Sequence, residues 1–347
     1  MKRTDLLGKL KQVSPALADT DMLPIMTCVW FEEDTVTAYN DRIGVTVDFP
    51  SGFAGAVHGE TLIKLLEYSH QDEIELIAVD GNLIIESGKA KKITLAAHAV
   101  DRRLFVMPGT SKDPLDVDLK AFAAALQTCQ RSVSDATTSP EYRGVTLVPE
   151  DDFVHLFAVN GATMTNVLIK IGGLDQPVVL PHRFCSQFGN FVSDDAHFEI
   201  NPDKGYALIE SEVGSLYGKL IEVEKPLPLI ATLRGLAGDD RLGQMVPVPD
   251  GFSNMLNCAS TVIDDITVGK TQIAIAKGSM VLTSKGNRGE NIDNAKVGKK
   301  HPDITVKVNP KLLKVGLDDG LDFILFGPKA AVMTDEKVTS LYVISTS

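Results

Sequence analysis

The sequence predicts an α+β protein built from three tandem copies of one domain, each running helix, three strands, helix, three strands. Residues 83–95 (LIIESGKAKKITL) and residues 208–220 (LIESEVGSLYGKL) are near repeats whose central glutamates lie 124 residues apart. The pair Leu-Tyr at 216–217 returns 125 residues later at 341–342. Because this period is much longer than that of a solenoid, it indicates a repeated domain.

The chain length fits this plan. With 347 residues, the chain has room for three copies of about 116 residues, an ordinary domain size. Pro- and Gly-containing stretches at residues 107–117 and 224–243 have the composition of connectors. We therefore expect domains at residues 1–114, 115–232 and 233–347.

An amphipathic helix is expected to open each copy. Residues 118–129 and 250–258 carry this pattern in the second and third copies, and each ends at the Cys of a phrase Cys-x-x-Ser/Thr-Val-x-Asp. Asp118 and Asp250 stand where an N-cap is expected, because Asp side chains accept hydrogen bonds from the first free N–H groups. Residues 4–13 occupy the same place in the first copy.

Three short strands follow each of these helices. They are apolar or alternating segments that break at polar turns, as half-buried strands do. Each middle strand ends in such a turn, at Asn40-Asp41, Asn160-Gly161 and Lys285-Gly286. The expected strands cover 25–31, 35–41 and 43–49 in copy one, 144–148, 153–161 and 162–169 in copy two, and 272–278, 280–286 and 287–297 in copy three.

A second helix follows in each copy, at residues 57–69, 180–192 and 308–317. Pro181 and Pro310 suit a first helical turn, where the missing N–H costs nothing. Three further strands end near His98, Glu222 and Ser345 in the successive copies. Sequential strands with few long crossovers favour antiparallel sheets, so both helices of a copy must lie on one face of its sheet.

Composition narrows the class of protein. The formal charge of −12 argues against coating nucleic acid over the whole surface, although a local basic patch remains possible. No apolar run reaches the ~20 residues of a membrane span, and the charged N-terminus is unlike a signal peptide, so we expect a cytoplasmic protein. Four widely separated cysteines indicate reduced thiols, and the histidines show no metal-binding spacing, so we expect neither metal nor cofactor.

Catalytic motifs are not evident, and we predict that the protein is not an enzyme. Residues 267–271 (TVGKT) resemble the end of a phosphate-binding loop, but Asp264 stands where that motif requires Gly. No serine is flanked as in a nucleophile elbow. Two other classes stay open at this point: a structural or assembly protein of tandem domains, and a hydrolase with scattered catalytic residues.

The repeat and several local phrases together resemble the bacterial-type DNA sliding clamp, the beta subunit of the replicative DNA polymerase III. The matching phrases are MLPIM at 22–26, EYRGVTL at 141–147, VVLPHRF at 178–184 and LYVISTS at 341–347. The chain departs from the family pattern at 160–162, where Asn-Gly-Ala replaces Asp-Gly-His. It departs further in the polar Ser345-Thr346 and in acidic Asp19 and Asp21. It is similar to a divergent clamp, and we hypothesise a phage or plasmid origin.

The resemblance implies a homodimeric ring whose helices line a hole for double-stranded DNA while antiparallel sheets form the outside. Such a ring is a DNA replication processivity factor that binds DNA without reading its sequence. The basic residues expected on the lining helices are Lys2, Arg3, Lys9, Lys11, Lys64, Arg131, Arg183, Lys311 and Lys314.

The resemblance also implies a groove between the second and third domains, which binds short apolar peptides of DNA polymerase and the clamp loader. Its expected wall is Val159, Gly161, Met164, Pro226, Val343 and Ile344. For the dimer interface we expect Ile93, Leu95, Val262 and Ile263.

Overall fold

The structure is a computed structural model of an α+β protein. It describes residues 1–20, 23–32, 34–87, 91–100, 104–134, 140–224, 227–237, 245–263, 270–298, 303–326, 330–337 and 339–345. Contacts divide the chain into two compact units. The first unit contains residues 1–124 and 171–222, and the second contains residues 125–170 and 223–347. Each unit therefore joins one end of the chain to part of its middle.

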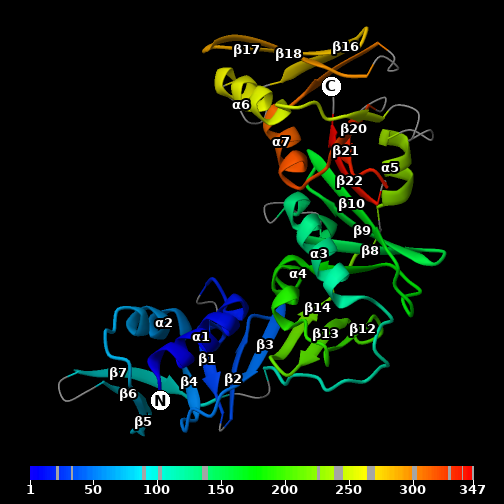
Figure 1. The fold of residues 1–347 in the computed structure, drawn as a ribbon. Helices are drawn as coiled ribbons and strands as arrows, with labels where there is room; N and C mark the ends of the chain where they lie inside the picture. The colour runs from blue at the N-terminus through cyan, green and yellow to red at the C-terminus, as the bar shows by residue number, and fades with distance from the viewer. Residues whose placement is uncertain are drawn as a thin grey trace. The chain divides into compact units, whose positions relative to one another are not determined.

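One ten-stranded sheet runs through the first unit, in the order β12-β13-β14-β3-β2-β1-β4-β7-β6-β5 (Figure 1). Its neighbouring strands pair antiparallel, as the short connections predict. The strands of this unit are β1 (Cys28–Phe31), β2 (Thr35–Tyr39), β3 (Ile43–Asp48), β4 (Gly55–His58), β5 (Glu75–Val79), β6 (Asn82–Ser87), β7 (Lys91–His98), β11 (Val178–Pro181), β12 (His197–Asn201), β13 (Tyr206–Ser211) and β14 (Gly214–Lys219).

The helices of the first unit bury their apolar faces against other elements, as predicted. α1 (Arg3–Val13) packs against α2 (Gly59–Glu67), and buries Leu6, Leu10 and Val13 at helical spacing. The short helices η1 (Ser14–Ala16) and η2 (Pro24–Thr27) follow α1. Phe188 of η5 (Phe188–Phe191) packs edge-on against Phe122 of α3 (Leu119–Cys129), and Phe184 of α4 (His182–Gln187) packs against Phe188 in turn.

The second unit contains two sheets. Seven of its strands run in the order β8-β9-β10-β22-β21-β20-β15, and four more in the order β18-β17-β16-β19. The strands are β8 (Gly144–Glu150), β9 (Phe153–Val159), β10 (Thr163–Ile169), β15 (Met245–Pro247), β16 (Thr271–Ala276), β17 (Ser279–Gly286), β18 (Gly289–Lys296), β19 (Ile304–Val308), β20 (Phe323–Phe326), β21 (Ala330–Thr334) and β22 (Ser340–Ser345). η3 (Gln130–Ser132) and η4 (Pro140–Arg143) precede β8.

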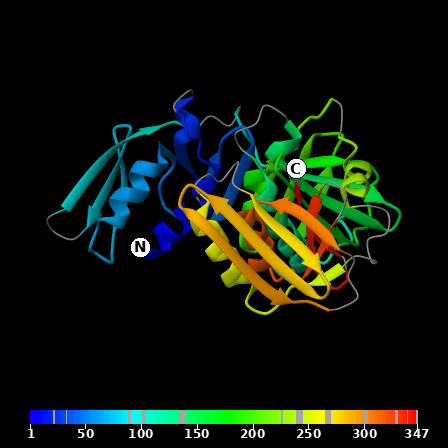
Figure 2. The same cartoon turned by 90° about the horizontal axis from the view of Figure 1, so that it is seen from above.

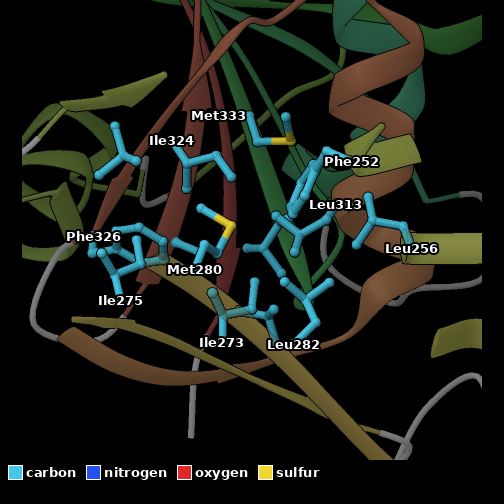
Figure 3. Packing of buried hydrophobic residues seen from close by; sticks show 14 of the residues in the cluster. Phe252, Leu256, Ile273, Ile275, Met280, Leu282, Leu313, Ile324, Phe326 and Met333 are labelled. Carbon is cyan, nitrogen blue, oxygen red and sulfur yellow. The ribbon is translucent and has the colours of Figure 1, made fainter. Parts of the chain in front are cut away.

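A continuous apolar core joins the two sheets of the second unit to helices α6 (Phe252–Val262) and α7 (Pro310–Asp318). Figure 3 shows Phe252, Met280, Leu313, Ile324 and Met333 gathered in it from five different elements. α6 also packs on β17 and β18, and the four-stranded sheet lies over this helix in Figure 2. This core explains why each of the two helices has an apolar face.

Two sequence-based details of the helices are wrong. α6 begins at Phe252 with Gly251 as its N-cap at φ +77°, and no side chain caps it, so Asp250 does not have the predicted role. Pro181 is the N-cap of α4 and so precedes its first turn, whereas Pro310 does begin α7. Asp118 does cap α3, since its Oδ1 accepts from the N–H groups of Lys120 at 2.9 Å and Ala121 at 3.0 Å.

The expected connector at 224–243 contains a further helix, α5 (Leu229–Ala237). Leu229 and Leu233 are buried one turn apart on α5, and this i, i+4 spacing could have indicated the helix. α5 contacts β21, so this connector is part of the packed second unit.

The repeat is visible in the geometry of two turns. Asn40 Oδ1 accepts from the N–H of Arg42 at 3.1 Å and of Ile43 at 3.0 Å. Asn160 Oδ1 accepts in the same way from Ala162 at 3.0 Å and Thr163 at 2.8 Å. The same local chemistry therefore closes the β2–β3 and β9–β10 turns, 120 residues apart.

Cys28, Cys129 and Cys185 are buried and Cys258 is exposed, and none of the four forms a disulfide within the part of the chain that the structure describes. Within the described ranges, no helix combines the length and apolarity needed to cross a membrane.

Candidate functional site

The predicted basic residues of the first helix pair have two different roles. The Arg3 guanidinium donates from Nη1 to Leu66 O at 2.9 Å and from Nε to Gln71 O at 3.1 Å. Leu66 lies in the last turn of α2 and Gln71 lies beyond its end, so the guanidinium binds the C-terminal end of this helix, where a cation is favoured. Arg3 thus joins α1 to α2 as a structural residue, whereas exposed Lys2 and half-buried Lys9 have no side-chain bond among the described residues.

Two exposed lysines of this pair face carboxylates. Lys11 Nζ lies 2.6 Å from Glu67 Oε1, and Lys64 Nζ lies 2.6 Å from Glu60 Oε1 one turn away. The hydrogen bond from Lys64 lowers the pKa of Glu60, and the same bond raises the pKa of Lys64. Exposed pairs of this kind are screened by solvent and contribute little stability, so either lysine can exchange its carboxylate for another anion.

Arg183 on α4 contacts the segment that follows η1. Its Nη1 donates to Leu17 O at 3.1 Å and Pro15 O at 3.4 Å, and its Nη2 pairs with Asp19. The acidic Asp19, which departs from the family pattern, therefore neutralises a basic residue expected to face DNA. Reversing the charge of Arg183 would break these contacts, so such a variant cannot isolate a DNA effect.

In the second unit, Arg131 on η3 pairs with Asp319 and donates to Val315 O at 3.4 Å. Both partners belong to the end of α7, whose free carbonyls favour a cation. Lys314 Nζ donates to Asn257 Oδ1 at 2.6 Å and so joins α7 to α6. Lys311 is half-buried in the first turn of α7.

Helix α6 of the second unit offers an uncharged exposed face. The exposed residues of α6 are Asn254, Asn257, Cys258 and Thr261. Amide and hydroxyl groups of this kind hydrogen-bond an anion without attracting it over distance. The described helices can therefore supply weak, sequence-independent phosphate attraction, concentrated on α1.

The expected peptide-binding residues meet on three neighbouring strands. Met164 on β10 is opposite Val159 on β9 and opposite Val343 on β22. Ile344 is adjacent to Val343 and points to the other sheet face, because successive strand residues alternate. It packs in the core with α6 and α7, so the structure does not bring it together with Met164.

We define the junction cluster as the apolar group around Met164 and Val343. Leu229 and Leu233 of α5 cover the strands, so Met164 is 5% exposed and Val343 is 2% exposed. The cluster consists of Phe157, Met164, Leu229, Leu233, Leu325, Ala330, Val332, Leu341 and Val343, with a half-buried rim of Val148, Val159, Leu227, Ile230 and Met245. The rim is the part of this cluster that an apolar side chain from another molecule can reach first.

The remaining expected groove residues lie at or beyond the edge of this cluster. Gly161 is exposed in the β9–β10 turn at φ +85°, a conformation that favours glycine. Pro226 lies outside the described residues.

The expected interface residues lie near open strand edges. Ile93 and Leu95 are half-buried on β7, which pairs with β6 along its length and with β4 only through Ala97 and His98. Val262 is half-buried and Ile263 is buried at the end of α6. They approach the end of β17 closely, since a Cβ on Gly286 would lie 2.1 Å from Val262 O.

The described residues contain no group of three or more His, Cys, Asp or Glu side chains that could hold a metal ion.

No protein-family model and no curated protein matches the sequence. The fold is that of a DNA sliding clamp, as solved structures show over the full chain. The beta subunit of DNA polymerase from Streptococcus pyogenes matches with a TM-score of 0.82 and 18% identity, and the DNA polymerase III beta subunit of Thermotoga maritima with 0.82 and 15%. A DNA polymerase sliding clamp from Pseudomonas aeruginosa matches with 0.82 and 13%. Each match covers 100% of this chain and 98% of the other.

Proposed function

We propose that the chain is a DNA sliding clamp, a cytoplasmic, non-catalytic processivity factor that encircles double-stranded DNA and tethers a polymerase. The observation that carries the proposal is the clamp fold over the whole chain, with 98% of each compared clamp matched. The phosphate attraction of α1 supports it, because a ring that holds DNA topologically needs only weak contacts.

Ring closure is proposed through strands β7 and β18 of two copies of the chain. β3 and β10, third strands of their copies, pair with the last strands β14 and β22. Among the described strands, the third strand of copy three, β18, and the last strand of copy one, β7, are left without such a partner. Strand edges with unpaired N–H and C=O groups tend to pair with another strand. Lys92 on β7 and Glu290 on β18 supply opposite charges.

Retention on DNA circles tests the clamp directly. The protein, loaded on a nicked circle by its clamp loader or by spontaneous opening, should stay bound through gel filtration and be lost when the circle is cut. The variant Ile292→Lys, at a side chain 62% exposed on β18, should run as a monomer and lose retention, whereas Phe153→Lys, 46% exposed outside the edge, should not. Equal retention on circles and linear DNA would overturn the proposal. Larger species without DNA would favour an assembly protein.

The partner site is proposed at the rim of the junction cluster, where short peptides of a polymerase or clamp loader insert apolar anchors. Val159→Glu and Ile230→Glu should each weaken a labelled peptide with Leu and Phe anchors by at least tenfold, measured by fluorescence anisotropy. Because Met164 and Val343 are buried, charging them would test folding instead. The exposed Thr232→Glu on α5 is the matched control, and peptide affinity unchanged in both rim variants would exclude this site.

A further inference from the structure

A second set of three residues in the first unit repeats the register of the peptide site. Gly44 on β3 is opposite Tyr39 on β2 and opposite Tyr217 on β14. This is the arrangement of Met164 with Val159 and Val343, since both sets join the second and third strands of one copy to the last strand of another. Tyr39 and Gly44 precede Val159 and Met164 by 120 residues.

The position above Gly44 is filled by the chain itself. The Phe105 ring stacks on Tyr39 with centroids 4.1 Å apart and an interplanar angle of 9°, and it meets Tyr217 at 5.3 Å. A Cβ on Gly44 would lie 2.4 Å from the tip of this ring, so glycine leaves the space that the ring occupies. Phe105 packs with Tyr39 and Tyr217 in an apolar cluster of the first unit.

Phe105 is inserted as a single anchor. Its neighbours Leu104 and Val106 are 36% and 69% exposed. Further along, the segment is held by Ser111, whose N–H donates to Glu199 Oε2 at 2.9 Å. Residues 104–106 thus present one partly buried aromatic side chain between two exposed apolar neighbours. Short peptides bind grooves with the same arrangement of a single inserted anchor.

We propose that the surface of Tyr39, Gly44 and Tyr217 is a second peptide site, which Phe105 occupies as an internal ligand. The occupant it accepts once Phe105 is removed is a short peptide with one aromatic anchor, of the chemistry of residues 104–107. By filling this site with its own connector, the chain restricts partner peptides to the junction cluster. The inference deepens the proposed function by naming a second site of the same kind.

Peptide stoichiometry tests the proposal. The probe is a labelled peptide that copies residues 104–110, titrated into full-length chains that carry Val159→Glu to weaken the junction cluster. Addition of Phe105→Ala should raise the amount of peptide bound at saturation by one equivalent per chain, and addition of Val106→Ala should not raise it. Gly44→Met introduces at position 44 the side chain that Met164 has in the junction cluster. Added to Phe105→Ala, it should abolish the extra equivalent of bound peptide.

Gly44→Met alone provides a second test, a protease assay on a chain that still contains Phe105. It should displace the ring and make the bond after Phe105 cleavable by chymotrypsin at least tenfold faster than in the unchanged chain. A folded Phe105→Ala chain without a new equivalent, or a gained equivalent that survives Gly44→Met, would overturn the proposal. No readout requires DNA, so failed circle retention with an intact peptide gain would sink the clamp function and leave this site standing.

Discussion

The two junctions, β3 with β14 and β10 with β22, share one strand register but bury different side chains. The first is closed by aromatic rings above a glycine, with Phe105 of the connector inserted. The second is built from aliphatic residues, Phe157 and Met164, and α5 of its connector packs in the same cluster. A repeated backbone plan therefore does not fix a binding site. The side chains at three paired positions, and the connector that reaches them, decide whether the surface is closed.

The two helix pairs differ in a similar way. The pair α1 and α2 carries four of the predicted basic residues on its helices, whereas the exposed face of α6 is uncharged. In each pair, one predicted basic residue joins the two helices by a hydrogen bond. Arg3 donates to Leu66 O between α1 and α2, and Lys314 donates to Asn257 between α7 and α6. Attraction to phosphate is therefore expected to be strongest at α1.

The largest effect that separates the junctions is expected at Glu199, whose buried carboxylate holds the first connector. Burial raises its pKa, but hydrogen bonds from Lys112 N–H, Tyr206 and Ser111 N–H outweigh this and lower the pKa from 4.5 to about 2. Glu199→Gln should destabilise the first unit by about 3 kcal/mol, because it weakens several hydrogen bonds to a buried carboxylate at once. Urea unfolding followed by far-UV circular dichroism measures the loss, with the exposed Glu212→Gln as the control.

The same carboxylate predicts a pH dependence for the first junction alone. Because the folded pKa is depressed, the contribution of Glu199 is present above pH 4.5 and is lost as the pH falls towards 2. The stability gap between Glu199→Gln and the unchanged chain should therefore shrink across this window. A gap that stays constant from pH 5 to about 2 would contradict the assigned pKa.

A smaller loss is expected for the internal ligand. Phe105→Ala removes a partly buried ring and its stacking on Tyr39, and should lower the free energy of unfolding by about 2 kcal/mol. Val106→Ala, one position along and 69% exposed, should change it by less than about 0.5 kcal/mol. Equal losses in urea unfolding would mean that the ring is not held as described.

The smallest effect distinguishes the two roles of basic residues on α1. Arg3→Ala should cost about 1 kcal/mol of stability, because it removes the two hydrogen bonds from the guanidinium to Leu66 O and Gln71 O. Lys9→Ala should leave stability unchanged and reduce the slope of log affinity against log salt by about 1 for linear duplex DNA. The reverse assignment, with Lys9 affecting stability and Arg3 only the salt slope, would refute this division.

Much of the fold could be predicted from the sequence, since periodicity and turn chemistry are local. The turn at Asn40 and the N-cap at Asp118 follow from hydrogen bonds within three residues. The sequence predicts a connector where α5 lies, because prolines and glycines flank this short apolar helix. The role of Arg3 could not be predicted, since its acceptors lie more than 60 residues away in the sequence.

The peptide site itself stays a prediction. The resemblance to the clamp family predicts Val159, Met164 and Val343 in one wall, and the strand register does make Met164 the pairing partner of both other residues. Ile344 was misplaced because alternation alone does not say which of two apolar residues faces which core. Met164 is buried in one cluster with Leu233 of α5. The position of α5 on the sheet depends on long-range packing, which a local sequence pattern does not show.

The order of elements in the three copies and the distribution of charge can be read along the chain, because both depend on neighbouring residues. The hydrogen bonds of basic side chains to distant carbonyls, and the insertion of Phe105 at the first junction, emerge only in the folded protein. Those outcomes depend on packing between segments far apart in sequence, where the free energy of burying a ring or a guanidinium is set by whatever surface the fold brings against it.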